Sequence, residues 1–270
     1  MSHHQHSHAA KNPNHFLTLR NKFLKYMHDT ELWASYLPRI PWITILLAVV
    51  GLSLIVASFI TPGLDSTLLK ISSLALGSLL ILPIVFAGDF AFRKWKYVQA
   101  VRKQILDSIP WRGDEKVLDI GCGSGLLLNG AAMRLTTGKA IGIDIWAPRS
   151  GGGNYSLLMR NAKAEGVADM IEFKEADVRQ LPFEDATFDV ILSSGALHHI
   201  SHNLPDHELA IKEMTRVLKP GGRIILWDTT HMVTAYASRM KASGIESEVT
   251  KSDSSMLGFE MSMMAGSKVK

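Results

Sequence analysis

The sequence predicts an α/β fold with a seven-stranded sheet, preceded by an α-helical transmembrane hairpin. Two observations lead to this prediction. Residues 42–60 ("WITILLAVVGLSLIVASFI") and 71–88 ("ISSLALGSLLILPIVFAG") are apolar runs without a charged residue. From residue 116 onward, short apolar runs alternate with amphipathic segments, which is typical of a parallel sheet covered by helices on both faces. A chain of 270 residues has room for one such domain and a smaller N-terminal unit.

The two apolar runs have the length and the connection of a membrane hairpin. Nineteen helical residues rise about 28 Å, close to the ~30 Å thickness of the bilayer hydrocarbon. A turn containing Pro62 and Gly63 joins the runs. Membrane helices tolerate an interior proline such as Pro83, and Gly77 and Ser78 favour close helix contact. Two buried helices of a soluble protein are the alternative, but neither run has a polar face. A signal peptide does not fit the 41 residues that precede the first run.

The charge of the chain is concentrated around these runs. The net charge of the chain is +4. Residues 1–106 carry 11 Lys/Arg and 4 Asp/Glu, whereas residues 107–270 carry 18 Lys/Arg and 21 Asp/Glu. Basic residues restricted to the flanks of apolar segments indicate a lipid bilayer as partner, and not nucleic acid. By the positive-inside rule, we expect a multi-pass membrane protein with both termini and the α/β domain on the cytoplasmic side. With Cys122 as the single cysteine, an intrachain disulfide is excluded.

The pattern divides the chain into four parts. Residues 1–41 hold a His-rich tail and a basic interfacial helix, 42–90 the transmembrane hairpin, 91–112 a basic linker helix and 113–270 the α/β domain. The interfacial helix is predicted from apolar residues at three- and four-residue spacing beside basic ones, and a helix packed on the α/β domain is equally compatible. The tail "SHHQHSH" has no fixed partner ligands for a metal, so a disordered tail is favoured and no metal is predicted.

The elements of the α/β domain follow from the alternation of patterns. The predicted strands are Lys116–Ile120, Ala140–Ile143, Ile171–Glu175, Phe188–Ser193, Arg223–Trp227, Ser247–Lys251 and Leu257–Met264. The predicted helices are Leu126–Leu135, Tyr155–Glu165, Pro205–Leu218 and Met232–Ala242. The alternation in "FEMSMM" indicates that the last strand is antiparallel and has one more polar face.

Polar and glycine residues follow several of these strands, where the carboxyl edge of the sheet forms a ligand site. The first strand leads into "DIGCGSG", whose glycines allow a tight turn and close approach of the backbone to a ligand at a helix N-terminus. Asp144 ends the second strand and could accept hydrogen bonds from both hydroxyls of a ribose. Asp177 follows the third strand and could accept from an adenine amino group. The fourth strand ends in "LSSGALHHI" at the same edge.

These motifs carry a resemblance to a known family. "VLDIGCGSG", "IGIDIW", "ADVRQLPFEDATFDVILSSGALHHI" and "EMTRVLKPGGRIILWD" resemble, in order and spacing, the motifs of class I S-adenosylmethionine-dependent methyltransferases. Within that class they are most similar to the small-molecule branch that includes the ubiquinone and menaquinone biosynthesis methyltransferases. The resemblance covers about Gly113 to Asp228 and implies a Rossmann-like fold with S-adenosyl-L-methionine as cofactor.

The resemblance also implies roles for residues at matching positions. The methionine part of the cofactor would be held by Asp119, Gly121, Gly123 and Gly125, with Cys122 at a position in the loop that takes a small residue. Asp144 would bind the ribose. Ile145 or Trp146 would cover the adenine, and Asp177 and Val178 would bind its edge. Ser193 or Ser194 would line the passage to the methyl group. "LKPGG" would mark the turn into the fifth strand.

Two histidines are candidates for acid–base chemistry. His198 and His199 lie just past the fourth strand, where the methyl group is expected, and a neutral imidazole suits removal of a proton near pH 7. The alternative is that one of them is buried at the sheet edge and the other caps the loop. His202, His207 and His231 are weaker candidates.

One segment departs from the family pattern. After Asp144 the chain runs "IWAPRSGGGNYS", longer and richer in glycine than the usual turn, so Gly151–Gly153 belong either to a flexible loop or to a lid over substrate or cofactor. Asn154 could cap the helix that begins at Tyr155. The segment between the fifth strand and the last two is short and lacks the large substrate cap of many relatives.

Together these features predict a membrane-anchored S-adenosylmethionine-dependent methyltransferase that acts on a small, lipophilic acceptor. The first alternative is a membrane protein whose methyltransferase-like domain binds cofactor as a scaffold or regulator. A nucleotide-dependent oxidoreductase is disfavoured, because the loop reads GCGSG where GxGxxG is expected and no Tyr is followed four residues later by Lys. The sequence leaves open the acceptor atom, the membrane and the oligomeric state.

Overall fold

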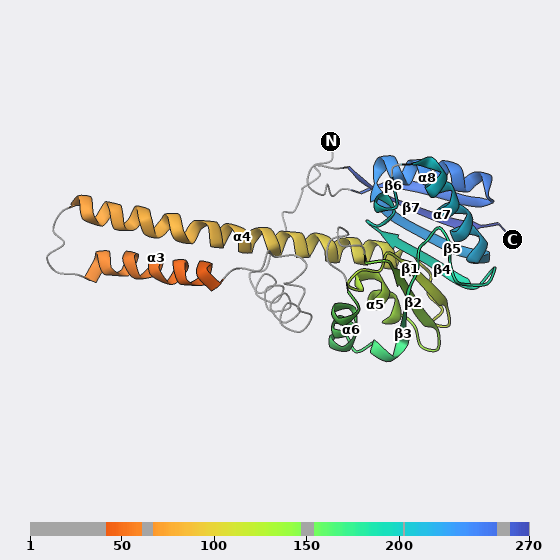
Figure 1. The fold of residues 1–270 in the computed structure, drawn as a ribbon, viewed down its shortest axis with the longest axis horizontal. Helices are drawn as coiled ribbons and strands as arrows, with labels where there is room; N and C mark the ends of the chain where they lie inside the picture. Colours follow the sequence, from red (N-terminus) through yellow and green to blue (C-terminus); the bar gives the residue numbers. More distant parts are fainter. Residues whose placement is uncertain (1–41, 61–66, 147–153, 202, 253–259, 270) are drawn as a thin grey trace, which may run out of the picture.

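The computed structural model describes residues 42–60, 67–146, 154–201, 203–252 and 260–269. The predicted His-rich tail, the interfacial helix, His202 and Gly151–Gly153 lie outside these residues. Two long helices, α3 (Trp42–Ile60) and α4 (Thr67–Asp107), lie side by side and project from a compact α/β domain (Figure 1). The molecule is therefore an elongated arm joined to a globular body.

The two helices of the arm approach each other closely at glycine. A Cβ atom on Gly77 would lie 2.7 Å from the carbonyl oxygen of Gly51 and 2.4 Å from Cγ1 of Ile55. A larger residue at 77 would push the helices apart, so the close contact that the sequence predicts at this glycine is present.

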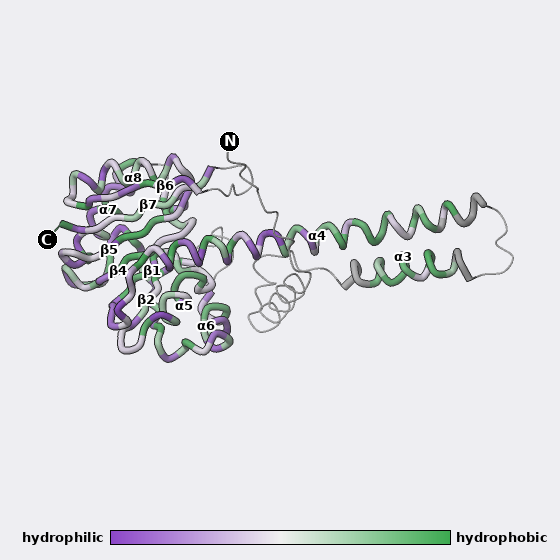
Figure 2. Tube along the Cα trace, turned by 180° about the vertical axis from the view of Figure 1, so that it is seen from behind, coloured by the Kyte–Doolittle hydropathy of each residue, from purple (hydrophilic) through white to green (hydrophobic). Residues whose placement is uncertain are grey.

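Many apolar side chains of the arm lie on its outside. Leu79 and Phe86 of α4 are 69% and 73% exposed, and hydrophobic residues follow α3 and the outer part of α4, whereas the part of α4 near the body carries more hydrophilic residues (Figure 2). Of the helices in the described ranges, one is long and apolar enough to cross a membrane, the 74–107 part of α4, while the apolar stretch recognised in α3, Leu46–Ala57, is shorter. The two-span hairpin therefore stays a prediction.

Helix α4 does not stop where its apolar part ends. The sequence suggests a second span at 71–88 and a linker helix at 91–112, whereas the structure has one helix that continues through Pro83 to Asp107. Val101, Ile105 and Leu106 of its last part are buried in the core of the α/β domain. One helix thus belongs to both the arm and the body.

The body is built on one seven-stranded sheet in the order β3-β2-β1-β4-β5-β7-β6. The strands are β1 (Lys116–Ile120), β2 (Lys139–Asp144), β3 (Ile171–Glu175), β4 (Phe188–Ser194), β5 (Leu218–Thr229), β6 (Ile245–Lys251) and β7 (Met261–Lys268). The first five run parallel, and β7 is antiparallel to both β5 and β6, which confirms the predicted sheet with its antiparallel last strand.

Helices cover both faces of the sheet. The end of α4 packs on one face with α5 (Leu126–Ala132) and α6 (Tyr155–Ala164), and α7 (Leu204–Val217) and α8 (Thr230–Ala242) pack on the other. Two short 3₁₀ helices, η1 (Ala168–Met170) and η2 (Leu197–His199), follow α6 and β4. The N-terminus of α6 is capped as predicted, since the side-chain oxygen of Asn154 accepts from the amide of Leu157 at 2.8 Å.

The structure corrects several predicted boundaries. Helix α5 ends at Ala132 and not at Leu135, and α8 begins two residues before Met232. Strand β5 already begins at Leu218, so "LKPGG" is part of the strand. Leu218 pairs with Phe188, and the register shifts before Val190 pairs with Arg223. The predicted turn is therefore an irregular first section of the strand.

The character of the last strand was also predicted wrongly. It runs from Met261 to Lys268, later than the expected 257–264, and its first four residues are all buried. The reason is topology, because β7 lies between β5 and β6, where Met263 packs on the α4 face and Met264 on the α7 face. A strand inside a covered sheet has no polar face.

Candidate active site

The glycine loop between β1 and α5 is held in a conformation that only glycine adopts easily. Gly121, Gly123 and Gly125 have φ angles of +70°, +51° and +92°. The amides of Gly121 and Cys122 both donate to the carbonyl oxygen of Ile143, at 2.9 and 3.0 Å, which fixes the loop against β2. A Cβ on Gly121 would lie 2.2 Å from that of Ala196, whereas one on Gly123 would meet nothing within 4 Å. The loop is thus tightly packed beneath and open at Gly123.

Asp144 connects the ends of β1 and β2. Its Oδ2 accepts from the amide of Gly123 at 2.9 Å, and its Oδ1 accepts from the amide of Trp146 at 2.8 Å. Each carboxylate oxygen keeps a second lone pair, and the side chain is half-buried. The ribose role expected for Asp144 stays a prediction, to which the structure adds a role in holding the glycine loop.

Two ionisable groups beneath the loop are uncharged near neutral pH. Burial raises the pKa of Asp119 to about 8. The charge of Asp144 also raises this pKa, whereas a hydrogen bond from the backbone of Leu128 lowers it. Burial, with the same two acids, holds the pKa of the Cys122 thiol well above its usual range. Cys122 is therefore a small buried residue without nucleophilic character, which suits the small-residue position implied by the resemblance.

Trp146, the aromatic residue that follows β2, stacks on another side chain of the protein. The indole of Trp146 lies parallel to the ring of Phe173 with 4.0 Å between centroids, and its backbone has a φ of 39°. Ile145, by contrast, is 52% exposed. Of the two residues expected to cover the adenine, Ile145 is the one that offers free apolar surface.

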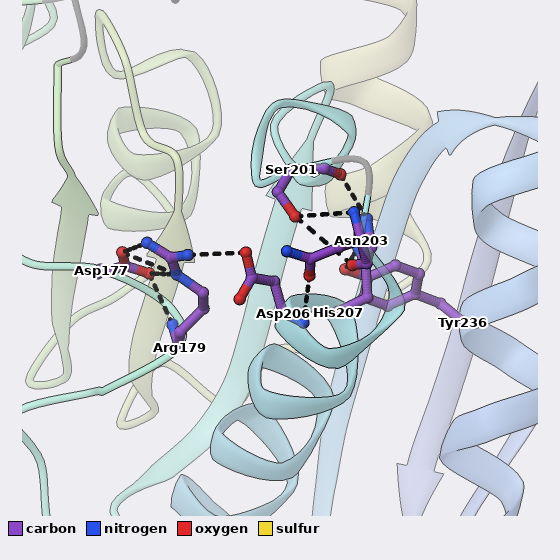
Figure 3. Close-up of polar contacts among 7 residues, drawn as sticks. All are labelled: Asp177, Arg179, Ser201, Asn203, Asp206, His207 and Tyr236. Atoms are coloured by element: carbon purple, nitrogen blue, oxygen red, sulfur yellow. Dashed lines mark hydrogen bonds and ion pairs between the residues drawn. The ribbon is translucent and has the colours of Figure 1, made fainter.

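Asp177 lies in an ion-pair network (Figure 3). Nη2 of Arg179 donates to Oδ2 of Asp177 at 2.6 Å, and the backbone amide of Arg179 donates to Oδ1 of Asp177 at 2.9 Å. Nη1 of Arg179 donates to Asp206 at 2.9 Å. The hydrogen bond from the Arg179 side chain is the main cause that lowers the pKa of Asp177. Sequence reasoning missed Arg179 and Asp206, whose pairing joins the β3 loop to α7. Val178 is buried beside them, and its expected contact with adenine, like that of Asp177, stays a prediction.

His198 and His199 lie at the carboxyl edge, in the short helix η2 after β4. Nδ1 of His198 is 3.0 Å from both carboxylate oxygens of Asp228, which is buried at the end of β5. This hydrogen bond raises the pKa of His198, whereas burial and then the neighbouring His198 lower the pKa of His199. Because an ionised carboxylate only accepts, Nδ1 of His198 is the donor and its Nε2 keeps a free lone pair.

Asp228 is a further functional candidate that sequence reasoning missed. A signal was present, since Asp228 stands near the end of β5 as Asp119 and Asp144 stand near the ends of β1 and β2. Its partner could not be found from the sequence, because η2 and the end of β5 are 30 residues apart.

The remaining candidates have structural partners. Nε2 of His207 lies 2.9 Å from the carbonyl oxygen of Ser201 and its Nδ1 lies 2.8 Å from the hydroxyl of Tyr236, so the imidazole joins α7 to α8 (Figure 3). The buried Ser193 donates from Oγ to the carbonyl oxygen of Ile120 at 3.0 Å, and Ser194 is half-buried. His231 is exposed. Within the described residues no group of three or more His, Cys, Asp or Glu side chains is placed to hold a metal.

Comparison with known proteins shows what this domain is similar to. Residues 118–226 match a family model described as a methyltransferase domain. The chain is 37% identical to 27-O-demethylrifamycin SV methyltransferase of Amycolatopsis mediterranei over 123 residues. This aligned stretch is 44% of this chain and 40% of that protein. The chain is 34% identical to demethylmenaquinone methyltransferase of Lactiplantibacillus plantarum over 130 residues, and this aligned stretch is 48% of this chain and 51% of that protein.

Among solved structures, that of the cyclase SpnF is similar with a TM-score of 0.53 and 16% identity, covering 63% of this chain and 81% of that chain. This likeness shows the fold alone. The chain spans about half the length of the curated relatives that it matches. The family model covers β2, β3, β4 and most of β1 and β5, and does not reach β6 and β7.

Proposed function

We propose that this methyltransferase transfers a methyl group from S-adenosyl-L-methionine to a small, lipophilic acceptor, and that its N-terminal third anchors it in a membrane. The observation that carries the proposal is the carboxyl edge of the sheet. There the open glycine loop, the Asp144 carboxylate that holds it and His198 lie within residues 118–226, which match a methyltransferase domain, and Asp228, the partner of His198, follows two residues later.

The residues of this edge fit the cofactor. Among the described residues nothing lies within 4 Å of a Cβ placed on Gly123, so its backbone is open to a ligand. The free lone pairs of Asp144 suit two ribose hydroxyls, and the exposed Ile145 suits one face of an adenine. When bound, the cofactor supplies an electrophilic methyl group on a sulfonium. Gly121, Gly123 and Gly125 would hold its methionine part, with Asp119 beneath them.

The histidine pair supplies the base that an acceptor with a hydroxyl or an acidic C–H requires. Nε2 of His198 accepts the acceptor's proton, and Asp228 fixes the tautomer and stabilises the imidazolium that results. The raised pKa of His198 makes it a stronger base than a free imidazole. His199 stays neutral beside it, because burial and its neighbour lower its pKa. Orientation of the acceptor in line with the methyl group supplies the rest of the acceleration.

Three observations support a lipophilic acceptor and a membrane anchor. The arm exposes apolar side chains such as Leu79 and Phe86, which water does not favour. Helix α4 is long enough to cross a bilayer. The relatives named above are a demethylmenaquinone methyltransferase and a demethylrifamycin methyltransferase. Arg93, Lys94 and Lys96 after the apolar part favour a cytoplasmic position for the domain.

Two measurements test this function. Titration of the purified full chain with S-adenosylmethionine should show binding, and absence of binding at micromolar concentrations would contradict the cofactor assignment. Incubation of the protein and cofactor with a membrane lipid extract, followed by mass spectrometry, should reveal a product heavier by one CH₂ unit. Binding without turnover on any fraction would favour the scaffold or regulatory alternative.

A further inference from the structure

The last part of α4 crosses the sheet from its carboxyl edge to its amino edge. The ring of Tyr97 packs against that of Trp227, 6.0 Å between centroids, and Trp227 lies near the carboxyl end of β5. Asp107, at the end of the helix, accepts from Arg134 at 2.6 Å, and Arg134 follows α5 on the way to the start of β2. The helix therefore runs opposite to the parallel strands.

The dimensions agree with this path. From Tyr97 to Asp107 an α-helix rises about 15 Å, and a five-residue strand such as β1 is about 17 Å long. Everything in α4 before Tyr97 therefore projects from the carboxyl edge, which is the edge with Asp144, His198 and Asp228. The arm and the candidate active site share one end of the domain.

The apolar surface of α4 ends close to that edge. Phe90 is 47% exposed, and the basic residues Arg93, Lys94 and Lys96 follow within two turns. From Phe90 to Tyr97 the helix rises about 10 Å, comparable to the polar headgroup layer on one side of a bilayer, which is ~5–7 Å thick. A bilayer around the apolar part would place the carboxyl edge at or just above the headgroups.

The joint between arm and domain is rigid. Arg102 donates from Nη1 and Nη2 to the two carboxylate oxygens of Glu165 at 3.0 and 2.7 Å, and the two side chains are only 12% and 11% exposed. Gly130 of α5 leaves the space for this guanidinium, since a Cβ there would lie 2.5 Å from Nε of Arg102. Together with the buried Ile105 and Leu106, the ion pair fixes the direction in which α4 leaves the domain.

From this geometry we propose that the carboxyl edge of the sheet faces the bilayer, so that the acceptor is a membrane amphiphile that presents its acceptor atom at headgroup level. The apolar tail of such a molecule stays in the hydrocarbon during the reaction. A substrate that dissolves in water gains nothing from this arrangement, whereas a long-chain quinol or similar ring compound reaches the edge without leaving the membrane. This inference rests on the proposed membrane anchor.

The test measures the depth of two labelled positions in the full chain. Glu260, exposed beside the carboxyl end of β5, and Thr137, exposed in the turn before β2, are each replaced by cysteine in separate variants and labelled with a fluorophore. The single native cysteine, Cys122, is buried and the same in both. The protein is inserted into phosphatidylcholine vesicles that contain a lipid with a nitroxide near its headgroup. We expect loss of most of the fluorescence at position 260 and little loss at 137.

A third variant tests the rigid arm. Seven alanines inserted between Arg93 and Lys94 add about 10 Å to the helix and almost two full turns, so the domain moves away from the bilayer without large rotation. Quenching at position 260 should then fall toward that at 137. Equal quenching at the two positions, stronger quenching at 137, or no effect of the insertion would overturn the proposal.

The outcomes also separate this inference from the proposed function. A chain that fails to float with vesicles would refute both the anchor and the orientation of the edge, while S-adenosylmethionine binding by the same preparation would leave the methyltransferase assignment standing. A chain that floats and binds cofactor but shows the reversed quenching pattern would refute the orientation alone.

Discussion

The Nδ1 atom of His198 lies 3.0 Å from each carboxylate oxygen of Asp228. A buried carboxylate that contacts an imidazole in this way holds it in one tautomer and favours its protonated form. Replacement of Asp228 by Asn should therefore lower both the pKa of His198 and the strength of the base.

The expected kinetic result of Asp228→Asn has two parts. Since His198 acts as a base only when neutral, the rate rises with pH through its pKa, and a lower pKa moves this rise to lower pH. At the same time kcat should fall roughly 10²-fold, the usual contribution of general base catalysis. A pH profile of methyl transfer measures both, with the exposed His231→Gln as control. An unchanged profile would exclude His198 as the base.

Asp144→Ala should abolish cofactor binding, because it removes the expected ribose acceptor and the partner of the Gly123 amide. Calorimetric titration with S-adenosylhomocysteine measures the loss. Asp144→Asn serves as the comparison, since its single carbonyl oxygen can still accept from one amide and partial binding is expected. Wild-type affinity in Asp144→Ala would refute the ribose role.

Gly121→Ala should destabilise the domain more than a positive φ alone explains. An alanine there has an unfavourable backbone conformation, which costs about 1–2 kcal/mol, and its Cβ would collide with Ala196. Gly166 is the matched control, because its φ of +73° is close to the +70° of Gly121 but a Cβ there meets nothing within 4 Å. The thermal unfolding midpoint should fall further in Gly121→Ala than in Gly166→Ala. Equal shifts would mean that the loop near Ala196 moves aside.

Removal of the buried partner of Arg102 should strongly destabilise the joint between α4 and the body. Glu165→Gln leaves a buried guanidinium without its charge partner, a change that typically costs about 3–5 kcal/mol. The control is Asp89→Asn, which breaks the exposed pair with Arg93 and should cost less than about 1 kcal/mol. Thermal unfolding of the detergent-solubilised chain compares the two, and similar midpoints would argue against a rigid joint.

Asp119 should make the stability of the ligand-free protein depend on pH. Its pKa rises from an ordinary 3.8 to about 8 on folding, so the folded state binds more protons between these values and stability falls as pH rises through that range. Asp119→Asn, which mimics the protonated side chain, should flatten this dependence, with the exposed Asp169→Asn as control. Unfolding midpoints at about pH 6 and about pH 8 provide the measurement. A slope that persists in Asp119→Asn would mean that other groups cause it.

Local patterns predicted most of the sheet. Strands β1 and β3 have the predicted bounds, because apolar runs bounded by turn residues identify buried parallel strands well. The character of β7 could not be predicted, since its burial depends on insertion between β5 and β6, far away in sequence. The continuity of α4 was hidden for a different reason, because the change from apolar to basic residues after residue 88 looks like the end of a helix in the sequence.

For the candidate site, the sequence located the residues but not their partners. Gly121, Asp144 and His198 were found because they follow strands, and the carboxyl ends of parallel strands share one edge. The contacts of Asp228 with His198 and of Arg179 with Asp177 and Asp206 depend on side-chain directions that no local pattern encodes. These contacts decide which groups are charged, so the chemistry of the edge became clear only in three dimensions.

The place of β7 inside the sheet has a consequence for the order in which the chain can fold during synthesis. In the described sheet β6 pairs with β7 alone, so β6 has no partner until the ribosome has made the strand that follows it. Helices α3 and α4, by contrast, are made first and are available to a membrane while the later strands are still being translated. Closure of the sheet is thus a late event that follows translation of β7, and with the membrane anchor proposed above, insertion of α3 and α4 would precede it.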